Sequence, residues 1–123
     1  MTSPTTHRNS VVIAGRITAE PALRELSSGH TLARWRVAVT RPVADQRGRV
    51  KTDAVTCVTF DPSIHDSLRE WRLGDVVEVS GALRRRFWRA ESGPVSTFEV
   101  EARSVSWLAA GSTASVKRAS RPS

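Results

Sequence analysis

The chain has 123 residues, 39% of them hydrophobic, and carries a formal net charge of +7. This length suits one folded domain with short tails, and the hydrophobic content argues against a wholly disordered chain. No apolar run approaches the ~18–20 residues that span a bilayer, and the N-terminal segment lacks the apolar stretch of a secretory signal. These features predict a soluble, cytoplasmic protein that does not bind membranes.

Positive charge is concentrated in a few segments. Residues 41–51 hold four basic residues and one acidic residue, residues 84–89 hold four arginines, and residues 109–123 hold three basic residues and no acidic one. The remainder of the chain has a net negative charge. This distribution is typical of a groove or arms that bind a polyanion. Charge that only maintains solubility is the alternative.

The N-terminal third of the chain predicts strands. Residues 10–17 are rich in β-branched residues and lead to a turn near Glu20-Pro21, and residues 23–26 form a short strand after it. A turn signal follows, and residues 32–40 then alternate large apolar residues with arginine and small residues.

This alternation assigns the side chains of residues 32–40 to two faces. Trp35 is expected to face the core, and Arg34 and Arg36 the opposite side. The two arginines there would meet either phosphate or solvent, and the pattern does not decide between the two.

Residues 41–52 predict a long loop or a flexible hairpin, because they contain Pro42, Gly48 and several charges. Loops of this length are often functional. Arg49 and Lys51 are its candidate phosphate contacts.

Residues 53–60 predict the next strand, and Asp61-Pro62 after it is a signal for a helix start. Gly74 is expected to end the helix. Three apolar residues fall on one helical face: Ile64, Leu68 and Trp71. Trp71 is therefore interpreted as a packing residue.

The segment at residues 84–89 combines four arginines with two aromatic residues. In a strand, alternate residues share a face, so Arg84, Arg86 and Trp88 would point one way and Phe87 the other. Arginine neutralises phosphate, and an exposed indole stacks on any base, so this face is suited to single-stranded nucleic acid. In the alternative interpretation both aromatic residues are buried in a hairpin core and the arginines are only solvated.

Residues 75–83 and 95–108 predict the last two strands, joined by a turn at residues 91–94. Five strands with one helix between the third and the fourth match the all-β, five-stranded OB-fold barrel, which binds oligonucleotides. The expected organisation is a flexible N-terminus (1–9), one OB-fold domain (10–108) and a disordered basic tail (109–123).

An ordered set of short motifs carries a resemblance. These are Asn9-Ser10-Val11-Val12-Ile13-Ala14-Gly15-Arg16-Ile17, Glu20-Pro21, Phe60, Leu73-Gly74-Asp75-Val76-Val77-Glu78-Val79-Ser80-Gly81, and Trp88 before a Ser-Gly turn. From Asn9 to Leu108 the chain resembles the bacterial single-stranded DNA-binding proteins. The resemblance implies a homotetramer of OB-folds, around which single-stranded DNA wraps with its bases stacked on exposed aromatic residues.

Phe60 and Trp88 match two stacking positions of that family. At two further positions, where the family usually has tryptophan, the chain has Val43 and Ala54, which predicts weaker stacking. The sequence ends in a basic segment with Lys117, rather than in the family's acidic tip. We therefore expect an accessory paralogue that does not recruit repair enzymes through an acidic tail.

The sequence predicts binding of single-stranded DNA with little base specificity, in replication, recombination or repair at the nucleoid. The candidate DNA-binding residues are Trp88, Phe60, Arg84, Arg86, Arg34, Arg36, Arg49, Lys51 and Arg89. Binding of single-stranded RNA, or a role as a protein-interaction subunit, remains an alternative. No catalytic or metal-binding motif is recognisable, so neither an enzyme nor a cofactor is expected, and the lone Cys57 is expected to be a packed, unreactive thiol.

Overall fold

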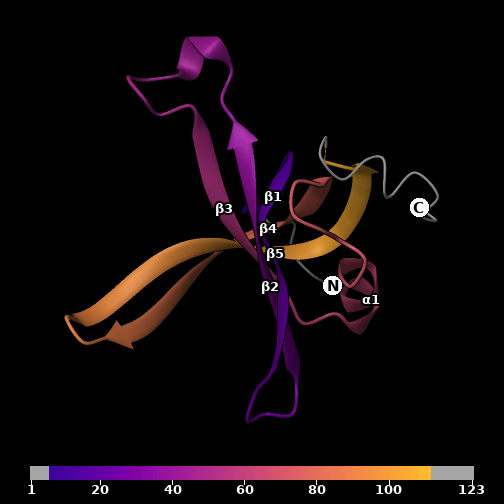
Figure 1. Cartoon of the computed structure of the whole chain (residues 1–123). Helices are drawn as coiled ribbons and strands as arrows, with labels where there is room; N and C mark the ends of the chain where they lie inside the picture. The colour runs from indigo at the N-terminus through magenta and orange to yellow at the C-terminus, as the bar shows by residue number, and fades with distance from the viewer. Residues whose placement is uncertain (1–5, 112–123) are drawn as a thin grey trace.

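The strands form a closed β-barrel (Figure 1). The structure is a computed structural model and describes residues 6–111. Its elements are β1 (Val11–Glu25), β2 (Thr31–Thr40), a 3-10 turn (Val43–Asp45), β3 (Thr52–Thr59), α1 (Pro62–Leu68), β4 (Val76–Ala90) and β5 (Gly93–Ala109). The strands follow one another around the barrel in the order β1-β2-β3-β5-β4, and the β3–β5 pair that completes the ring is parallel. The predicted OB-fold is confirmed.

β1 is one long strand, whereas the sequence predicted two strands separated by a turn. Its register with β2 shifts between Ile17 and Ala22, so Glu20-Pro21 forms an irregularity inside the strand. Proline lacks a backbone N–H and is tolerated in a sheet at such irregularities. The expected turn is therefore wrong: β1 pairs with β4 from Val11 to Arg16, and with β2 from Arg16 across the irregularity to Glu25.

α1 begins where the sequence predicted and ends earlier. Asp61 caps the helix by accepting a hydrogen bond from the backbone N–H of Ser63 at 2.9 Å. The helix ends at Leu68, so Gly74 is not its stop. Gly74 instead has a φ of +86° in the turn that precedes β4, a conformation that glycine adopts without strain. Trp71 lies in the intervening segment, yet it is buried as expected.

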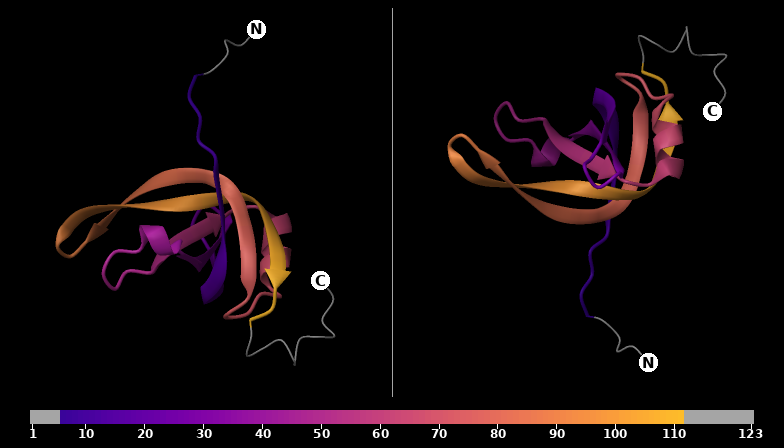
Figure 2. Two further views of the ribbon diagram at one scale, coloured as in Figure 1. Left: turned by 90° about the horizontal axis from the view of Figure 1, so that it is seen from above. Right: turned by 90° about the horizontal axis from the view of Figure 1, so that it is seen from below.

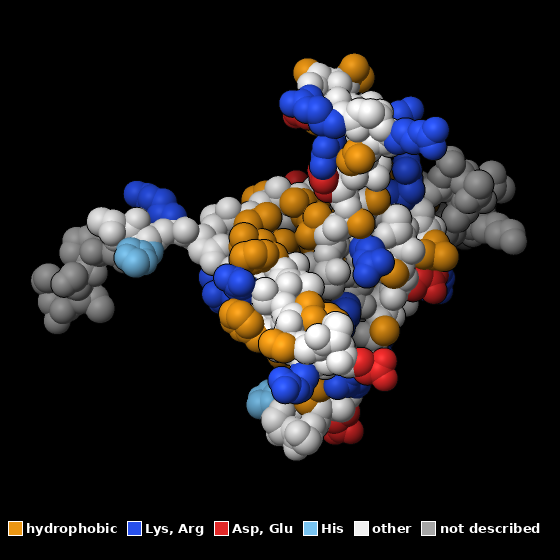
Figure 3. All heavy atoms as spheres, turned by 90° about the vertical axis from the view of Figure 1, so that its left-hand side faces the viewer, with side chains coloured by type: hydrophobic (Ala, Val, Ile, Leu, Met, Phe, Trp, Pro, Cys, Tyr) orange, Lys and Arg blue, Asp and Glu red, His pale blue; other side chains and the backbone are white. Residues whose placement is uncertain are grey.

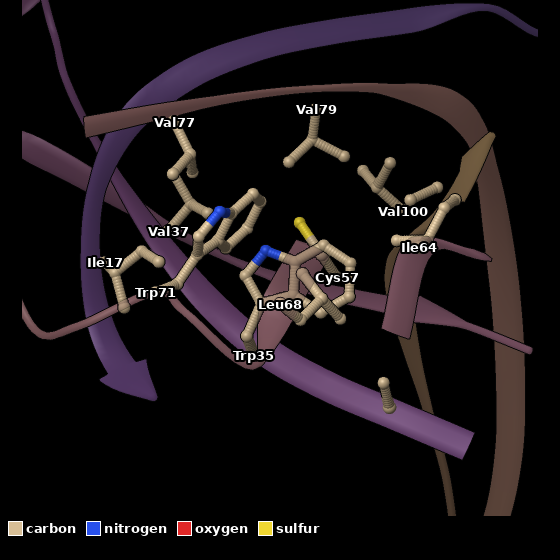
Figure 4. Packing of buried hydrophobic residues seen from close by; sticks show 12 residues of the cluster. Ile17, Trp35, Val37, Cys57, Ile64, Leu68, Trp71, Val77, Val79 and Val100 are labelled. Carbon is tan, nitrogen blue, oxygen red and sulfur yellow. The ribbon is translucent and has the colours of Figure 1, made fainter. Parts of the chain in front are cut away.

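The core is built around two tryptophans (Figure 4). Trp35 from β2 and Trp71 lie edge to face, with ring centroids 5.9 Å apart, and both are almost fully buried. Apolar residues from β1, β2, β4, β5 and α1 surround them: Ile17, Val37, Ile64, Leu68, Val77, Val79 and Val100. Cys57 packs in the same cluster, and burial raises the pKa of its thiol to about 12, so the thiol stays protonated at neutral pH.

Two long connections extend from the barrel on the side away from α1 (Figures 1 and 2). The β4–β5 hairpin remains paired to its tip, where Ala90 is opposite Gly93. The loop between β2 and β3 extends the β2–β3 hairpin, and it is held by a hydrogen bond from the Arg41 N–H to the Lys51 carbonyl and by the Arg41–Asp53 ion pair at 2.7 Å. Of the two alternatives predicted for residues 41–52, a long loop or a flexible hairpin, the structure shows a hairpin, the β2–β3 arm.

Both ends of the domain make contacts beyond the boundaries expected from the sequence. The Asn9 side-chain amide pairs with the backbone of Leu83, donating to its carbonyl at 2.8 Å and accepting from its N–H at 2.7 Å. At the other end β5 continues to Ala109, and the Gly111 N–H donates to Asp75 at 3.3 Å. The basic tail residues Lys117, Arg118 and Arg121 lie outside the described residues. Within residues 6–111, no helix has the length and apolarity to cross a membrane.

Candidate nucleic-acid interface

The basic segment lies on the β4–β5 hairpin, with its two faces as the alternation predicted. Arg84 is opposite Glu99 and Arg86 is opposite Thr97, while Trp88 follows two residues further along β4. Directly opposed residues share a face of a sheet. The outer face of the hairpin therefore carries Arg84, Arg86 and Trp88 together.

Trp88 is 47% exposed, which contradicts the alternative that it belongs to a hairpin core. It lines a hollow of about 300 Å³ between the hairpin and the β2–β3 sheet. The other residues that line this hollow are Arg34, Arg36, Thr56, Arg86, Thr97, Phe98 and Glu99. An indole wall with three guanidinium groups around it can hold a stacked base and its phosphates.

Phe60 is 42% exposed and lines a second, adjoining hollow of about 460 Å³. Its ring meets His30 edge-on, with centroids 6.5 Å apart. The hollow is lined by residues from several strands: Arg24, Leu26, Leu32, Val58, Arg84, Arg85, Arg86, Phe87, Glu99 and Glu101. Arg86 and Glu99 line both hollows, so the two aromatic residues lie on either side of this pair.

Carboxylates on β5 contact three of the predicted phosphate-binding arginines. Arg84 Nε donates to Glu101 at 2.9 Å, and Arg34 and Arg86 approach Glu99 at 3.8 Å and 3.9 Å. Burial raises the pKa of Glu99, the positive charge of Arg86 opposes the shift, and the Glu101 carboxylate adds to it. Within residues 6–111, Arg36 makes no ion pair.

The remaining predicted contacts lie at the margins of this surface. Arg49 and Lys51 are exposed on the β2–β3 arm, and Arg89 is exposed near the tip of the β4–β5 hairpin. None of the three lines either hollow. Figure 3 shows the basic side chains of the arm at the top and further basic side chains, interspersed with apolar ones, over the face below it.

Several residues of this surface were not predicted from the sequence. Arg85 lies between two exposed rings on the other face of the hairpin, 5.1 Å from the centroid of Phe87 and 5.6 Å from that of Phe98. Glu99 and Glu101 were also missed. Both residues alternate with the buried Val100, which places them on the opposite face of β5, but their position beneath the arginines depends on the pairing of β5 with β4.

The two positions where the resemblance implied tryptophan are both exposed. Val43 is 85% exposed in the 3-10 turn of the β2–β3 arm. Ala54 lies on β3 opposite Ala38, two residues from Thr56, which lines the Trp88 hollow. A larger side chain at Ala54 would therefore extend the face that carries Thr56.

Comparison with known proteins gives consistent results. Residues 8–108 match the single-strand binding protein family. The chain is 33% identical over 101 residues to a single-stranded DNA-binding protein of Oceanobacillus iheyensis, covering 81% of this chain and 63% of that protein. It is also 33% identical over 101 residues to single-stranded DNA-binding protein A of Bacillus subtilis, covering 81% of this chain and 59% of that protein.

A solved structure, a Plasmodium falciparum SSB complex with single-stranded DNA, superimposes with a TM-score of 0.71 at 26% identity, covering 86% of this chain and 99% of that one. The matched region is less than two thirds of the length of the bacterial relatives. The family match covers the whole barrel, from the residue before Asn9 to Leu108. The chain belongs to the single-strand binding protein family.

Proposed function

We propose that the protein binds single-stranded DNA with little base specificity and catalyses no reaction. The observation that carries this proposal is the half-exposed Trp88, set in a hollow with Arg34, Arg36 and Arg86. Stacking on an indole accepts every base, and guanidinium groups bind the phosphates that all nucleotides share. Membership of the family and the likeness to an SSB complex with single-stranded DNA support the proposal.

The proposed path of the bound single-stranded DNA runs from Phe60 past Arg86 to Trp88. The two hollows adjoin along the outer face of β3, β5 and β4, so one strand can occupy both. The basic β2–β3 arm, with Arg49 and Lys51, would contact phosphates beyond the Trp88 hollow. Binding on this path would protect single-stranded DNA in the cytoplasm, at the nucleoid, during replication, recombination or repair.

Affinity measured for oligo-dT, oligo-U and duplex DNA over a series of salt concentrations tests the function. We expect oligo-dT to bind most tightly, with log K falling linearly as log salt rises. Equal or tighter binding of oligo-U would favour RNA as the ligand. No binding of either strand would leave a protein-interaction role and refute the proposal.

We propose further that the chain forms a homotetramer, as the resemblance to the family implies. Outside the two hollows, the outer surface of the barrel exposes Val12 on β1 (62%) and Leu108 on β5 (50%). Apolar side chains of this size are suited to burial between subunits. Light scattering should give a mass about four times the 13.5 kDa of the chain. A monomer mass at micromolar concentration would contradict the tetramer.

A further inference from the structure

Glu99 places a carboxylate inside the surface proposed to bind phosphate. Only 12% of its side chain is exposed, and it lines both the Trp88 hollow and the Phe60 hollow. One carboxylate oxygen, Oε2, forms ion pairs with both arginines: it lies 3.8 Å from Arg34 Nη2 and 3.9 Å from Arg86 Nη1. This oxygen thus occupies the position between two guanidinium groups that a phosphate oxygen would take.

The geometry of this contact is loose. Both distances exceed those of a hydrogen bond, and Arg34 Nε is buried without a hydrogen-bond partner among residues 6–111. No hydrogen bond from Nε to residues 6–111 therefore fixes the guanidinium of Arg34 in this position, and the group can turn toward a phosphate. A phosphate can replace the carboxylate between the two arginines, but it meets the negative charge of Glu99 as it approaches.

We propose that Glu99 is an internal competitor that limits the affinity of the groove for single-stranded DNA by occupying a phosphate position between Arg34 and Arg86. This inference rests on the proposed function. DNA must push the carboxylate aside or have it neutralised. The residue therefore sets how tightly, and at which pH, the strand binds.

Glu101 provides a matched comparison on the same strand. It accepts a hydrogen bond from Arg84 Nε at 2.9 Å, and 37% of its side chain is exposed. It lines the Phe60 hollow and not the Trp88 hollow. Water screens its charge more strongly than that of Glu99, so its removal should affect binding less.

The pH dependence follows from the surroundings of Glu99. Burial raises the pKa of its carboxyl above the usual value. The charged and titratable groups around it come from every strand of the barrel: Arg24 on β1, Arg34 and Arg36 on β2, the buried Cys57 on β3, Arg84, Arg85 and Arg86 on β4, and Glu101 on β5. As the pH falls through the pKa of Glu99, the carboxyl becomes neutral and its repulsion of phosphate disappears. DNA should then bind more tightly.

The test compares the parent protein with Glu99→Gln, Glu99→Ala and Glu101→Gln, using labelled oligo-dT at about 0.1 M salt. At about pH 7.5 we expect both Glu99 variants to bind about tenfold more tightly than the parent, and Glu101→Gln at most about threefold. As the pH is lowered from there, the ratio of the affinity of Glu99→Gln to that of the parent should fall toward one. Protonated histidines do not affect this ratio, because both proteins carry them.

Each outcome decides one question. If the parent binds and both Glu99 variants bind equally or more weakly, then Glu99 positions the arginines and the competitor proposal is overturned, while the proposed function stands. A Glu101→Gln effect as large as that of Glu99→Gln would also overturn it, because any lost negative charge would then suffice. If the parent does not bind oligo-dT, both proposals fail. Thermal melting identifies folded variants, and Glu99→Ala decides the question if Glu99→Gln does not fold.

Discussion

Trp88 differs from the other three tryptophans in its surroundings. Trp35 and Trp71 are 1% and 3% exposed in the core, and Trp107 is half-buried and donates its Nε1–H to Asp75 at 3.1 Å. Trp88 makes no hydrogen bond to residues 6–111 that would fix its indole. Its 47% exposure leaves a ring face on which a base can stack.

At the residue scale, Trp88→Ala should weaken binding of oligo-dT by ~1–3 kcal/mol, the range found for loss of one base–aromatic stack. Phe60→Ala should cause a smaller loss, because its ring also packs against His30. Fluorescence anisotropy of labelled DNA gives both values. Leu73→Ala is the matched control, since Leu73 is 55% exposed and lines neither hollow.

The same variants separate stacking from packing. If Trp88 stabilises the fold rather than the complex, its alanine variant will melt at a lower temperature and keep the parent's affinity. A melting temperature unchanged within a few degrees, together with weaker binding, supports the stacking role.

At the scale of elements, a bulge in β5 explains why the outer face could not be read completely from the sequence. Ser80 is opposite Ser104, but the next pair is Gly81 with Ala102, so Arg103 is an extra residue in β5. The inward residues are odd-numbered after the bulge and even-numbered before it. The single alternation of β4 was predictable, whereas the switch in β5, which brings Glu99 beneath the arginines, depends on this bulge.

In other elements too, local signals were predictable from the sequence, and features that depend on pairing between distant segments were not. The strand of Trp35 and the helix cap at Asp61 were predicted because alternation and capping are local signals. The continuity of β1 through Glu20-Pro21 was not, because it depends on pairing with two different strands. The hollows were not predictable either, because they form only when the hairpin meets the β2–β3 sheet.

Gly81 lies at the bulge, where the backbone of β5 leaves no room for a side chain. A Cβ there would lie 2.0 Å from the carbonyl oxygen of Glu101, a backbone atom that cannot move independently. Gly81→Ala should therefore destabilise the fold by about 1–3 kcal/mol or more. Urea unfolding measures the change. A variant as stable as the parent would mean that β5 shifts freely at the bulge.

A substitution on β3 is expected to increase the affinity for single-stranded DNA. Ala54→Trp should tighten oligo-dT binding by about 1 kcal/mol, because the new indole extends the face of Thr56 that lines the Trp88 hollow. The gain should be similar for other base compositions. Ser67→Trp, at an exposed position on α1, controls for a general effect of an added indole. If a folded Ala54→Trp protein bound oligo-dT with unchanged affinity, this end of β3 would lie outside the path of the bound DNA.

Across the whole molecule, the basic residues of the β2–β3 arm are the positively charged groups that can contact single-stranded DNA beyond the two hollows. Arg49 and Lys51 are exposed on the β2–β3 arm, and this arm extends from the barrel on the side away from α1 (Figure 1). Phosphates bound by the arm would add to affinity without adding base preference. The arm would therefore act mainly on the salt dependence of binding.

The double variant Arg49→Gln, Lys51→Gln should flatten the slope of log K against log salt by about 1.4, since each phosphate contact in a single strand contributes about 0.7. Binding to oligo-dT at several salt concentrations gives the slope. Arg72→Gln is the control, because Arg72 is exposed in the segment between α1 and β4 and lines neither of the two hollows. Equal slopes in the double variant and the parent would place the arm outside the complex.

Stacking of single-stranded DNA on Trp88 is tested by titrating intrinsic tryptophan fluorescence with oligo-dT, in the parent and in Trp88→Phe. The parent's emission should be quenched on binding, because Trp88 is half-exposed while Trp35 and Trp71 are buried. Trp88→Phe should still bind, measured by anisotropy, and should lose most of the quenching. Quenching of the same size in both proteins, or none in a parent that binds, would contradict the account.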